Sequence, residues 1–221
     1  RSANVRIENS RLQPVGGSGI FAQKISRLTV NHSELCGASQ DGVRLYTGAV
    51  ADINNSRIAG QTMIGVALLD GSQADLFGCL FLDSAYGVYL DTATASVINC
   101  TFHQLSSNAV REATAGGALT MDNCAFGTTG FQPAVIVNFP GLLSRCAFVN
   151  GAQPLNAGDC FETTLAQMFV DASGGDFRPP VGSALIDFGI APPDGSPAVD
   201  INGEPRVSGV AIDIGALETN Y

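Results

Sequence analysis

Apolar and polar residues alternate along this chain in a phrase that recurs seven times, at intervals of 21 to 24 residues. Within each phrase every second residue is apolar, which predicts a β-strand rather than a helix. A fixed period of this length is typical of a solenoid, in which each repeat buries its apolar face only against its neighbours. The seven phrases begin at Val5, Leu28, Ala51, Ala74, Ala95, Leu119 and Gly141.

A polar residue or glycine followed by serine or cysteine breaks the alternation by one position in every phrase. The break predicts a sharp bend between two short strands, and asparagine tolerates the left-handed backbone that such a bend needs. We expect the asparagines to stack as a ladder, each side-chain amide bonding to the next, with breaks at Gly78 and Arg145. This column holds Asn9, His32, Asn55, Gly78, Asn99, Asn123 and Arg145.

A second signal, a glycine or alanine followed by isoleucine or valine, comes about nine residues after most of these serines and cysteines and predicts a third strand. Three short parallel strands per coil give an all-β fold, a right-handed parallel β-helix of about seven coils and roughly 34 Å. We expect the coils in residues 1–160 and an irregular C-terminal cap of the same structural domain in residues 161–221. A leucine-rich solenoid would need Leu-x-x-Leu-x-Leu and a helix in each turn, and the sequence has neither.

Composition narrows the range of partners. The chain has 221 residues, of which 14% are charged, and a net charge of −9 with a single lysine, Lys24. This balance argues against nucleic acid and anionic lipid, both of which require clustered basic residues. No apolar run reaches the length of a membrane span. An acidic surface with little lysine is typical of soluble extracellular proteins.

The first repeat has no polar cap in front of it, because Val5, Ile7 and Leu12 already belong to a full phrase. An uncapped solenoid end exposes core residues and strand edges. We therefore expect the chain to be the C-terminal part of a longer protein, with a missing N-terminal region or another subunit packed on the first coil.

Four of the six cysteines occupy one equivalent position in consecutive coils. We expect them to point inward as buried free thiols, because parallel side chains in a column suit disulfide geometry poorly. Cys36 and Cys160 are expected outside this column. No C-x-x-C pair predicts a zinc site. The four column residues are Cys79, Cys100, Cys124 and Cys146.

The C-terminal part carries four spaced motifs, at 169–178, 182–189, 200–206 and 213–218. Their order resembles the C-terminal region of bacterial parallel β-helix repeat proteins that is called the choice-of-anchor Q domain. Two positions depart from that pattern, Ala184 where proline is usual and Leu217 where an aromatic residue is usual. The resemblance implies a secreted or surface-displayed bacterial protein with a pectate-lyase-like solenoid, and it implies no particular reaction.

Asp187, Asp200, Asp213 and Arg206 punctuate this C-terminal part. We expect a capping network with Arg206 that folds over the last coil and covers its open strand edges. Clustered aspartates also suggest calcium, but their spacing follows no calcium-loop pattern. No metal site or cofactor is therefore predicted, and calcium stays an alternative.

Outward positions on the third strand of each coil form the candidate ligand site. Aromatic residues stack on sugar rings, and arginine pairs with uronate carboxylates in a bidentate manner. Asp91 could hold a cation or act as a base. The stripe consists of Arg44, Tyr46, Tyr89, Asp91 and Arg111.

Catalytic chemistry is less well supported, and no catalytic residue is assigned. A lyase would use Arg44 or Arg111, which the strand spacing puts roughly 10–15 Å apart. A glycosidase would use a carboxylate pair such as Asp70 and Asp91. His32 belongs to the asparagine column, and His103 is expected at a solvated turn.

The coils differ by only a residue or two, so no long insertion is available to wall a catalytic cleft. We therefore predict a secreted or cell-surface module that binds carbohydrate or serves an adhesive or structural role. A polysaccharide lyase or glycoside hydrolase acting on uronate-containing polysaccharide is the alternative. A trimeric tailspike segment would need apolar outward columns, and the apolar outward residues are too scattered for that.

Overall fold

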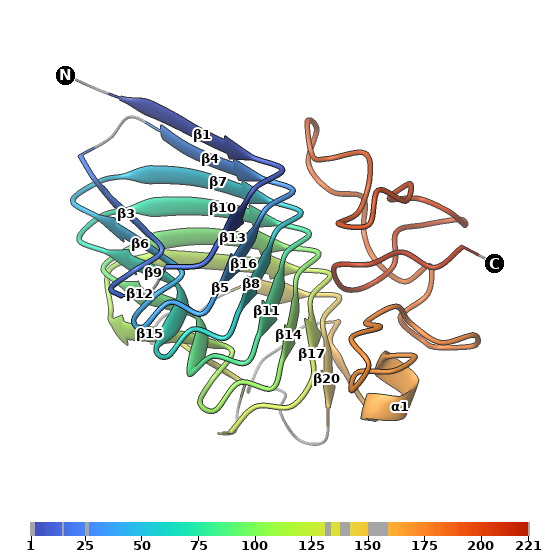
Figure 1. Cartoon of the computed structure of the whole chain (residues 1–221). Coiled ribbons are helices and arrows are strands. Elements are labelled where there is room, and N and C mark those ends of the chain that lie inside the picture. The colour runs from blue at the N-terminus through green and yellow to red at the C-terminus, as the bar shows by residue number, and fades with distance from the viewer. Residues whose placement is uncertain are drawn as a thin grey trace.

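Three parallel sheets run along a stack of coils in the computed structural model, which describes residues 3–14, 16–24, 27–130, 134–137, 142–149 and 159–220. Figure 1 shows the stack with its N-terminal coil at one end. Sheet A holds β1 (Asn4–Glu8), β4 (Arg27–Asn31), β7 (Val50–Asn54), β10 (Gln73–Phe77), β13 (Thr94–Ile98), β16 (Ala118–Asp122) and β19 (Leu142–Ser144).

The first corner of each coil leads from sheet A to sheet B. Sheet B holds β2 (Arg11–Leu12), β5 (Glu34–Cys36), β8 (Arg57–Ala59), β11 (Leu80–Leu82), β14 (Thr101–His103), β17 (Ala125–Phe126), β20 (Ala147–Val149) and β21 (Phe161–Thr163). Sheet C holds β3 (Ile20–Gln23), β6 (Val43–Tyr46), β9 (Ile64–Leu69), β12 (Tyr86–Asp91), β15 (Val110–Thr114) and β18 (Val135–Ile136).

The strands make six complete three-strand coils and a seventh with two strands in the described part of the chain. The predicted all-β parallel β-helix is confirmed. Gly141, which opens the seventh phrase, lies outside the described residues. The helix α1 (Leu165–Met168) is a single turn, and no helix in the described ranges is long and apolar enough to cross a membrane.

The first corner has the left-handed backbone that its asparagines predict. Asn9, His32, Asn55 and Asn99 have φ between 46° and 51°, and Gly78 has φ 64°. Among non-glycine residues, asparagine and a few others with similar side chains adopt the left-handed conformation at the lowest energetic cost. The corner column is therefore built where the sequence places it.

Inward columns of like residues fill the core. Phe81, Phe102, Phe126 and Phe148 stack with nearly parallel rings, whose centroids lie 4.5 to 5.1 Å apart. All four are buried. Burial of such a side chain stabilises a fold by roughly 1.5–3 kcal/mol, so this stack is a large part of what holds successive coils together.

The cysteine column is confirmed, and it is one residue longer than predicted. Cys79, Cys100, Cys124 and Cys146 are buried, and all six cysteines of the chain are free thiols. The expectation that Cys160 lies outside the column was wrong. Phe161 is paired with Ala147, so Cys160 stands beside Cys146 and continues the series.

The C-terminal segment (residues 164–220) is irregular, as expected, but its position differs from the prediction. It lies along the side of the stack rather than over the last coil, as the orange and red chain in Figure 1 shows. It reaches back as far as the third coil, where the carbonyl of Val199 accepts a hydrogen bond from Asn55. Only β21 extends the end of the solenoid, by pairing with β20.

The corner asparagines explain this position, because they bond more to the C-terminal segment than to one another. Asn123 donates to the carbonyl of Ile190 at 2.8 Å and accepts from the amide of the same residue at 2.9 Å. Asn99 donates to the carbonyl of Asp213 at 3.0 Å. The expected ladder survives in two contacts of 3.3 Å, Asn123 to Asn99 and Asn55 to His32.

Arg206 occupies the gap that Gly78 leaves in this column. A Cβ atom at position 78 would collide with the guanidinium of Arg206 and with the amide oxygen of Asn55. The guanidinium lies 5.3 Å from the ring centre of Phe77 and 3.5 Å from the carboxylate of Glu218. The interruption at Gly78 is therefore a socket for an arginine that arrives from far along the sequence.

The aspartates of the C-terminal segment act as acceptors for backbone amides. Asp200 accepts from the amides of Asn202, Glu204 and Glu218, and Asp187 accepts from those of Val210 and Ala211. Carboxylates that accept several N–H bonds hold irregular chain in one conformation. These hydrogen bonds give the repeated aspartates a structural role.

The outer face of sheet B changes character at the fourth coil. Its outward column is charged in the first three coils and then becomes apolar or small, at Leu80, Thr101, Ala125 and Ala147. Met168, Phe169, Phe177, Leu185, Ile214 and Leu217 pack on these later coils. The C-terminal segment thus completes a second apolar core outside the solenoid.

His103 belongs to this second core, so the expectation of a solvated turn was wrong. Its side chain is buried between the rings of Phe169 and Phe177, at 5.7 and 5.6 Å. The amide of Thr128 donates to its Nδ1 atom at 3.2 Å. Burial lowers the pKa of His103, and the nearby Asp83 carboxylate opposes this shift.

Substitution of Arg206 should loosen the C-terminal segment. Arg206→Ala leaves the carboxylate of Glu218 buried without its cation, which should lower the free energy of unfolding by about 3–5 kcal/mol. Urea unfolding and hydrogen exchange of residues 185–218 measure the effect. Arg206→Ala combined with Glu218→Gln should recover part of the loss. Unchanged exchange in the single variant would contradict the anchoring role.

Acidification should weaken the same packing through His103. The pKa of His103 is lower in the folded state than its unfolded value near 6.5, so the neutral ring is favoured by folding. This contribution is complete above that value and is lost as the pH falls through the folded pKa. When the pH is lowered from about 7.5 to about 5, the Tm of the parent protein should fall further than the Tm of the His103→Gln variant. Parallel Tm curves would exclude this role.

Candidate functional site

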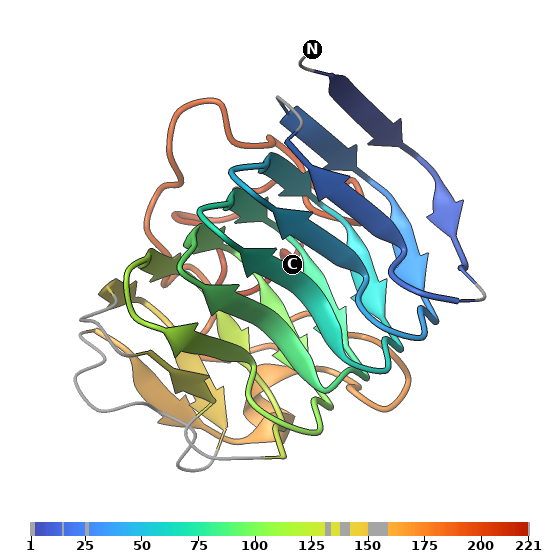
Figure 2. The same ribbon diagram turned by 90° about the vertical axis from the view of Figure 1, so that its left-hand side faces the viewer.

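The outer face of sheet C brings the predicted stripe residues into two neighbouring columns. Figure 2 looks onto the side of the stack on which this sheet lies. Tyr89 pairs with Arg111 on one side and with Ala67 on the other, and Ala67 pairs with Arg44. Tyr46 and Asp91 belong to the second column, in which Asp91 pairs with Leu69.

Aromatic residues that the sequence analysis left out of the stripe extend it. Phe21 pairs with Arg44 and is 61% exposed, so it continues the first column to the first coil. Tyr86 contacts Tyr89 edge to face, with ring centres 5.9 Å apart. Tyr86 could have been found from its place just before a Gly-Val signal. The first column therefore carries an aromatic or arginine side chain in four of five successive coils, with Ala67 in the third.

Arg44 has a structural partner of its own. Its Nε atom donates to Asp41 at 2.6 Å, and the Asp41 side chain is fully buried. The other carboxylate oxygen of Asp41 is buried without a hydrogen-bond partner among the described residues. A carboxylate in such surroundings depends on the arginine beside it, so Arg44 stabilises the turn as well as facing solvent.

The two catalytic alternatives for this face lose support in the structure. Arg44 and Arg111 stand three strands apart, roughly 14 Å by the spacing of parallel strands, too far to act on one sugar unit. Asp70 is not equivalent to Asp91, because it is a left-handed corner residue, and its carboxylate accepts from Thr47 at 3.0 Å. We see no catalytic pair on sheet C.

A carboxylate pair that the sequence analysis missed lies on the outer face of sheet A. Asp52 and Asp75 are direct partners on β7 and β10, and Arg27 forms an ion pair with Asp52. Burial raises the pKa of Asp75, and the Asp52 carboxylate adds to the shift. Asp52 and Asp75 each hold the second position of a repeat phrase, and that position points outward. This regularity is the sequence signal that could have revealed the pair.

A groove of about 640 Å³ holds this pair, between sheet A and residues 193–197 of the C-terminal segment. Direct partners on neighbouring parallel strands have backbones about 4.8 Å apart, so side chains of this pair can bring their carboxylates within the roughly 5 Å that retaining glycosidases use. The wall comes from the C-terminal segment, not from an insertion between strands. The expectation that coils without long insertions cannot form a walled cleft was therefore wrong.

Metal ligands do not gather in the described ranges. No group of three or more histidine, cysteine, aspartate or glutamate side chains is placed there to hold an ion.

The profile of the family described as right-handed β-helix region matches residues 1–148. The chain belongs to the right-handed β-helix family. No curated protein sequence matches this β-helix chain significantly.

A solved structure shares the β-helix architecture across almost the whole chain. The crystal structure of pectate lyase Pel9A superposes with a TM-score of 0.65 and 16% sequence identity, covering 97% of this chain and 59% of the lyase. The chain thus spans less than two thirds of that lyase. At this identity the likeness establishes the fold of the β-helix and its C-terminal segment, and nothing about chemistry.

Arg44 and Arg111 should differ in their effect on the stability of the β-helix. Arg44→Ala strips the buried Asp41 carboxylate of its cation and should lower the free energy of unfolding by about 3 kcal/mol. Arg111→Ala removes an exposed side chain and should change it by no more than about 0.5 kcal/mol. Urea denaturation of both variants measures the difference, and equal losses would refute the role of Arg44 in the turn.

Proposed function

We propose that this chain is a carbohydrate-binding β-helix module and that the ligand lies on the outer face of sheet C. The observation that supports this is the column from Phe21 to Arg111, which presents an aromatic or arginine side chain on every strand except that of Ala67. Sugar rings stack on aromatic faces, and arginine recognises the carboxylates of acidic sugars. An extended polysaccharide lying across the coils would meet a new side chain at every strand.

Secretion or surface display in a bacterium is part of the same proposal. It is supported by the acidic, lysine-poor composition and by the resemblance of residues 169–218 to the choice-of-anchor Q region. The structural neighbour is a pectate lyase, which makes a polysaccharide ligand reasonable for this chain. An adhesive or structural role would use the same exposed face.

The second candidate function is glycoside hydrolysis in the sheet A groove, favoured by Asp52 and Asp75. Their surroundings differ, because Asp52 pairs with Arg27 while the pKa of Asp75 is raised by burial. Two carboxyl groups with different environments can divide the roles of nucleophile and acid. Asp75 would protonate the leaving oxygen, and Asp52 would attack the sugar carbon.

Binding to a panel of neutral and uronate-containing polysaccharides tests the first function. In affinity electrophoresis, at least one polysaccharide in the gel should slow the migration of the parent protein. Tyr46→Ala combined with Arg111→Ala should weaken that retardation by about tenfold. Arg44 is left intact because its loss would disturb Asp41. Arg6→Ala, which removes an arginine from β1 on sheet A, is the matched control and should bind like the parent.

The outcomes separate the two functions. Retardation that the sheet C variant keeps in full would overturn the proposed site. New reducing ends in the same incubations, abolished by Asp75→Asn, would establish the hydrolase in place of a pure binding module. Unsaturated ends, detected by ultraviolet absorbance, would instead establish a lyase.

A further inference from the structure

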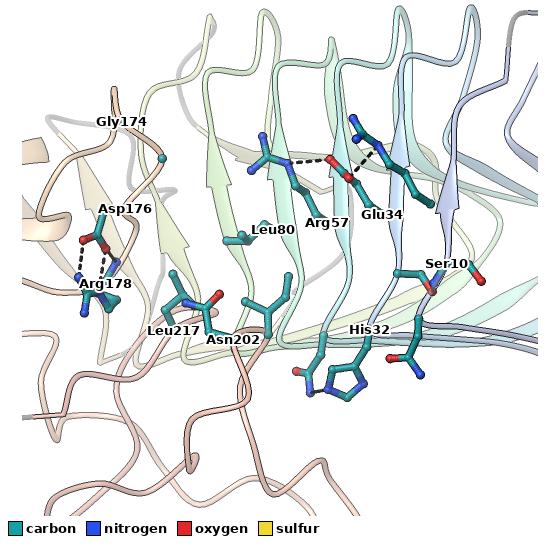
Figure 3. A pocket seen from close by; sticks show the side chains of 16 residues that line it. Ser10, His32, Glu34, Arg57, Leu80, Gly174, Asp176, Arg178, Asn202 and Leu217 are labelled. Atoms are coloured by element: carbon teal, nitrogen blue, oxygen red, sulfur yellow. Dashed lines mark hydrogen bonds and ion pairs between the residues drawn. The ribbon is translucent and has the colours of Figure 1, made fainter.

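A second groove, of about 870 Å³, lies on the other side of the corner column, between sheet B and the C-terminal segment. Figure 3 shows it from close by. Its floor is the uncovered part of sheet B, in the first three coils and Leu80. One wall is the loop from Gly174 to Arg178, and another is formed by Ile201, Asn202 and Leu217.

The floor of this groove carries a ladder of charges on successive strands. Arg11, Glu34 and Arg57 are direct partners on β2, β5 and β8. The Nε atom of Arg11 lies 3.0 Å from the Glu34 carboxylate, and that of Arg57 lies 3.6 Å from it. Both arginines use the Nε atom for Glu34. The terminal amino groups of Arg57 point away from Glu34 and can donate to a ligand (Figure 3).

Positive charge is concentrated here in an otherwise acidic chain. Three arginines face two carboxylates in the lining, with Arg178 and Asp176 paired on the wall, while the whole chain has a net charge of −9. Asparagine and serine side chains line the remaining floor, and His32 stands at the corner. Cationic groups interspersed with amides and hydroxyls match a ligand that carries both anionic groups and hydroxyls.

The dimensions of the ladder favour a linear ligand. The strands of Arg11 and Arg57 are two apart, roughly 10 Å by the strand spacing, and Glu34 bridges the two side chains. The floor runs along the stack, so a sugar chain with a charge on successive units would lie along it past both arginines.

We propose that this groove is a separate binding site for a linear anionic glycan, whose carboxylate or sulfate groups are bound by Arg11, Arg57 and Arg178. The inference does not rest on the sheet C stripe, because the two sites share no residue. The C-terminal segment is essential to it, because it supplies Arg178 and both walls.

Isothermal titration calorimetry of the full chain at low salt tests the site with alginate, dextran sulfate and uncharged dextran as probes. The parent protein should bind at least one of the two anionic polymers and should not bind dextran. Arg11→Ala combined with Arg57→Ala should reduce the affinity by about tenfold or more, and added salt should weaken binding of the parent. The side chains of Arg11 and Arg57 are 62% and 39% exposed, and ion pairs at such positions contribute little, so the variant should keep nearly the parent Tm.

Three controls make the result specific. Arg6→Ala removes an exposed arginine from sheet A and should bind like the parent, and Arg111→Ala tests independence from sheet C. Arg178→Ala should also weaken binding, although Arg178 lies on a wall of the groove and not on its floor. A preference for alginate would identify carboxylates, and a preference for dextran sulfate would identify sulfates. Equal binding by the Arg11/Arg57 and Arg6 variants, equal binding of dextran, or no binding of either anionic polymer would overturn the site.

Discussion

The left-handed backbone at the first corner of every coil is the constraint on which the rest of this structure depends. It turns the chain from sheet A to sheet B within two residues and places a row of amide side chains on the flank of the stack. Those amides need partners, because an unsatisfied polar group costs free energy once it is covered. Asn55, Asn99 and Asn123 find them in the backbone of the C-terminal segment. The corner that makes the solenoid possible therefore also decides where the irregular chain lies.

The C-terminal segment in turn creates the concave surfaces of the molecule. The coils are nearly uniform, and their bare faces would be flat. Residues 193–197 form a wall beside sheet A, and the loop from Gly174 to Arg178 forms a wall beside sheet B. Arg206 anchors the C-terminal segment to the solenoid, because its guanidinium fills the space that the missing side chain of Gly78 leaves. Function on these faces is thus coupled to the docking of a segment that has almost no regular secondary structure.

Much of the fold follows from the repeat, because a period of two and a fixed coil length permit few arrangements of the strands. The cysteine column and the sheet C columns could be placed by counting residues. The same count places Asp52 and Asp75 side by side on sheet A, but they lie on the first strand of their coils, outside the third-strand columns from which the stripe is predicted. His103 was misplaced for a different reason: nothing within its own coil indicates that Phe169 and Phe177 will cover it.

By itself, the sequence determined the strands, the corners, the inward columns and the register between neighbouring coils. These are local or nearest-neighbour properties, and each repeat restates them. Only the tertiary structure decided what lies on the flank: the socket of Arg206 at Gly78, the burial of His103 and the two grooves. Those contacts join residues far apart in the sequence, as do the hydrogen bonds between the corner column and the C-terminal segment, such as that of Asn99 with Asp213. An irregular segment has no period from which its partner could be counted, so its position emerges only when all the surfaces that it can cover are present together.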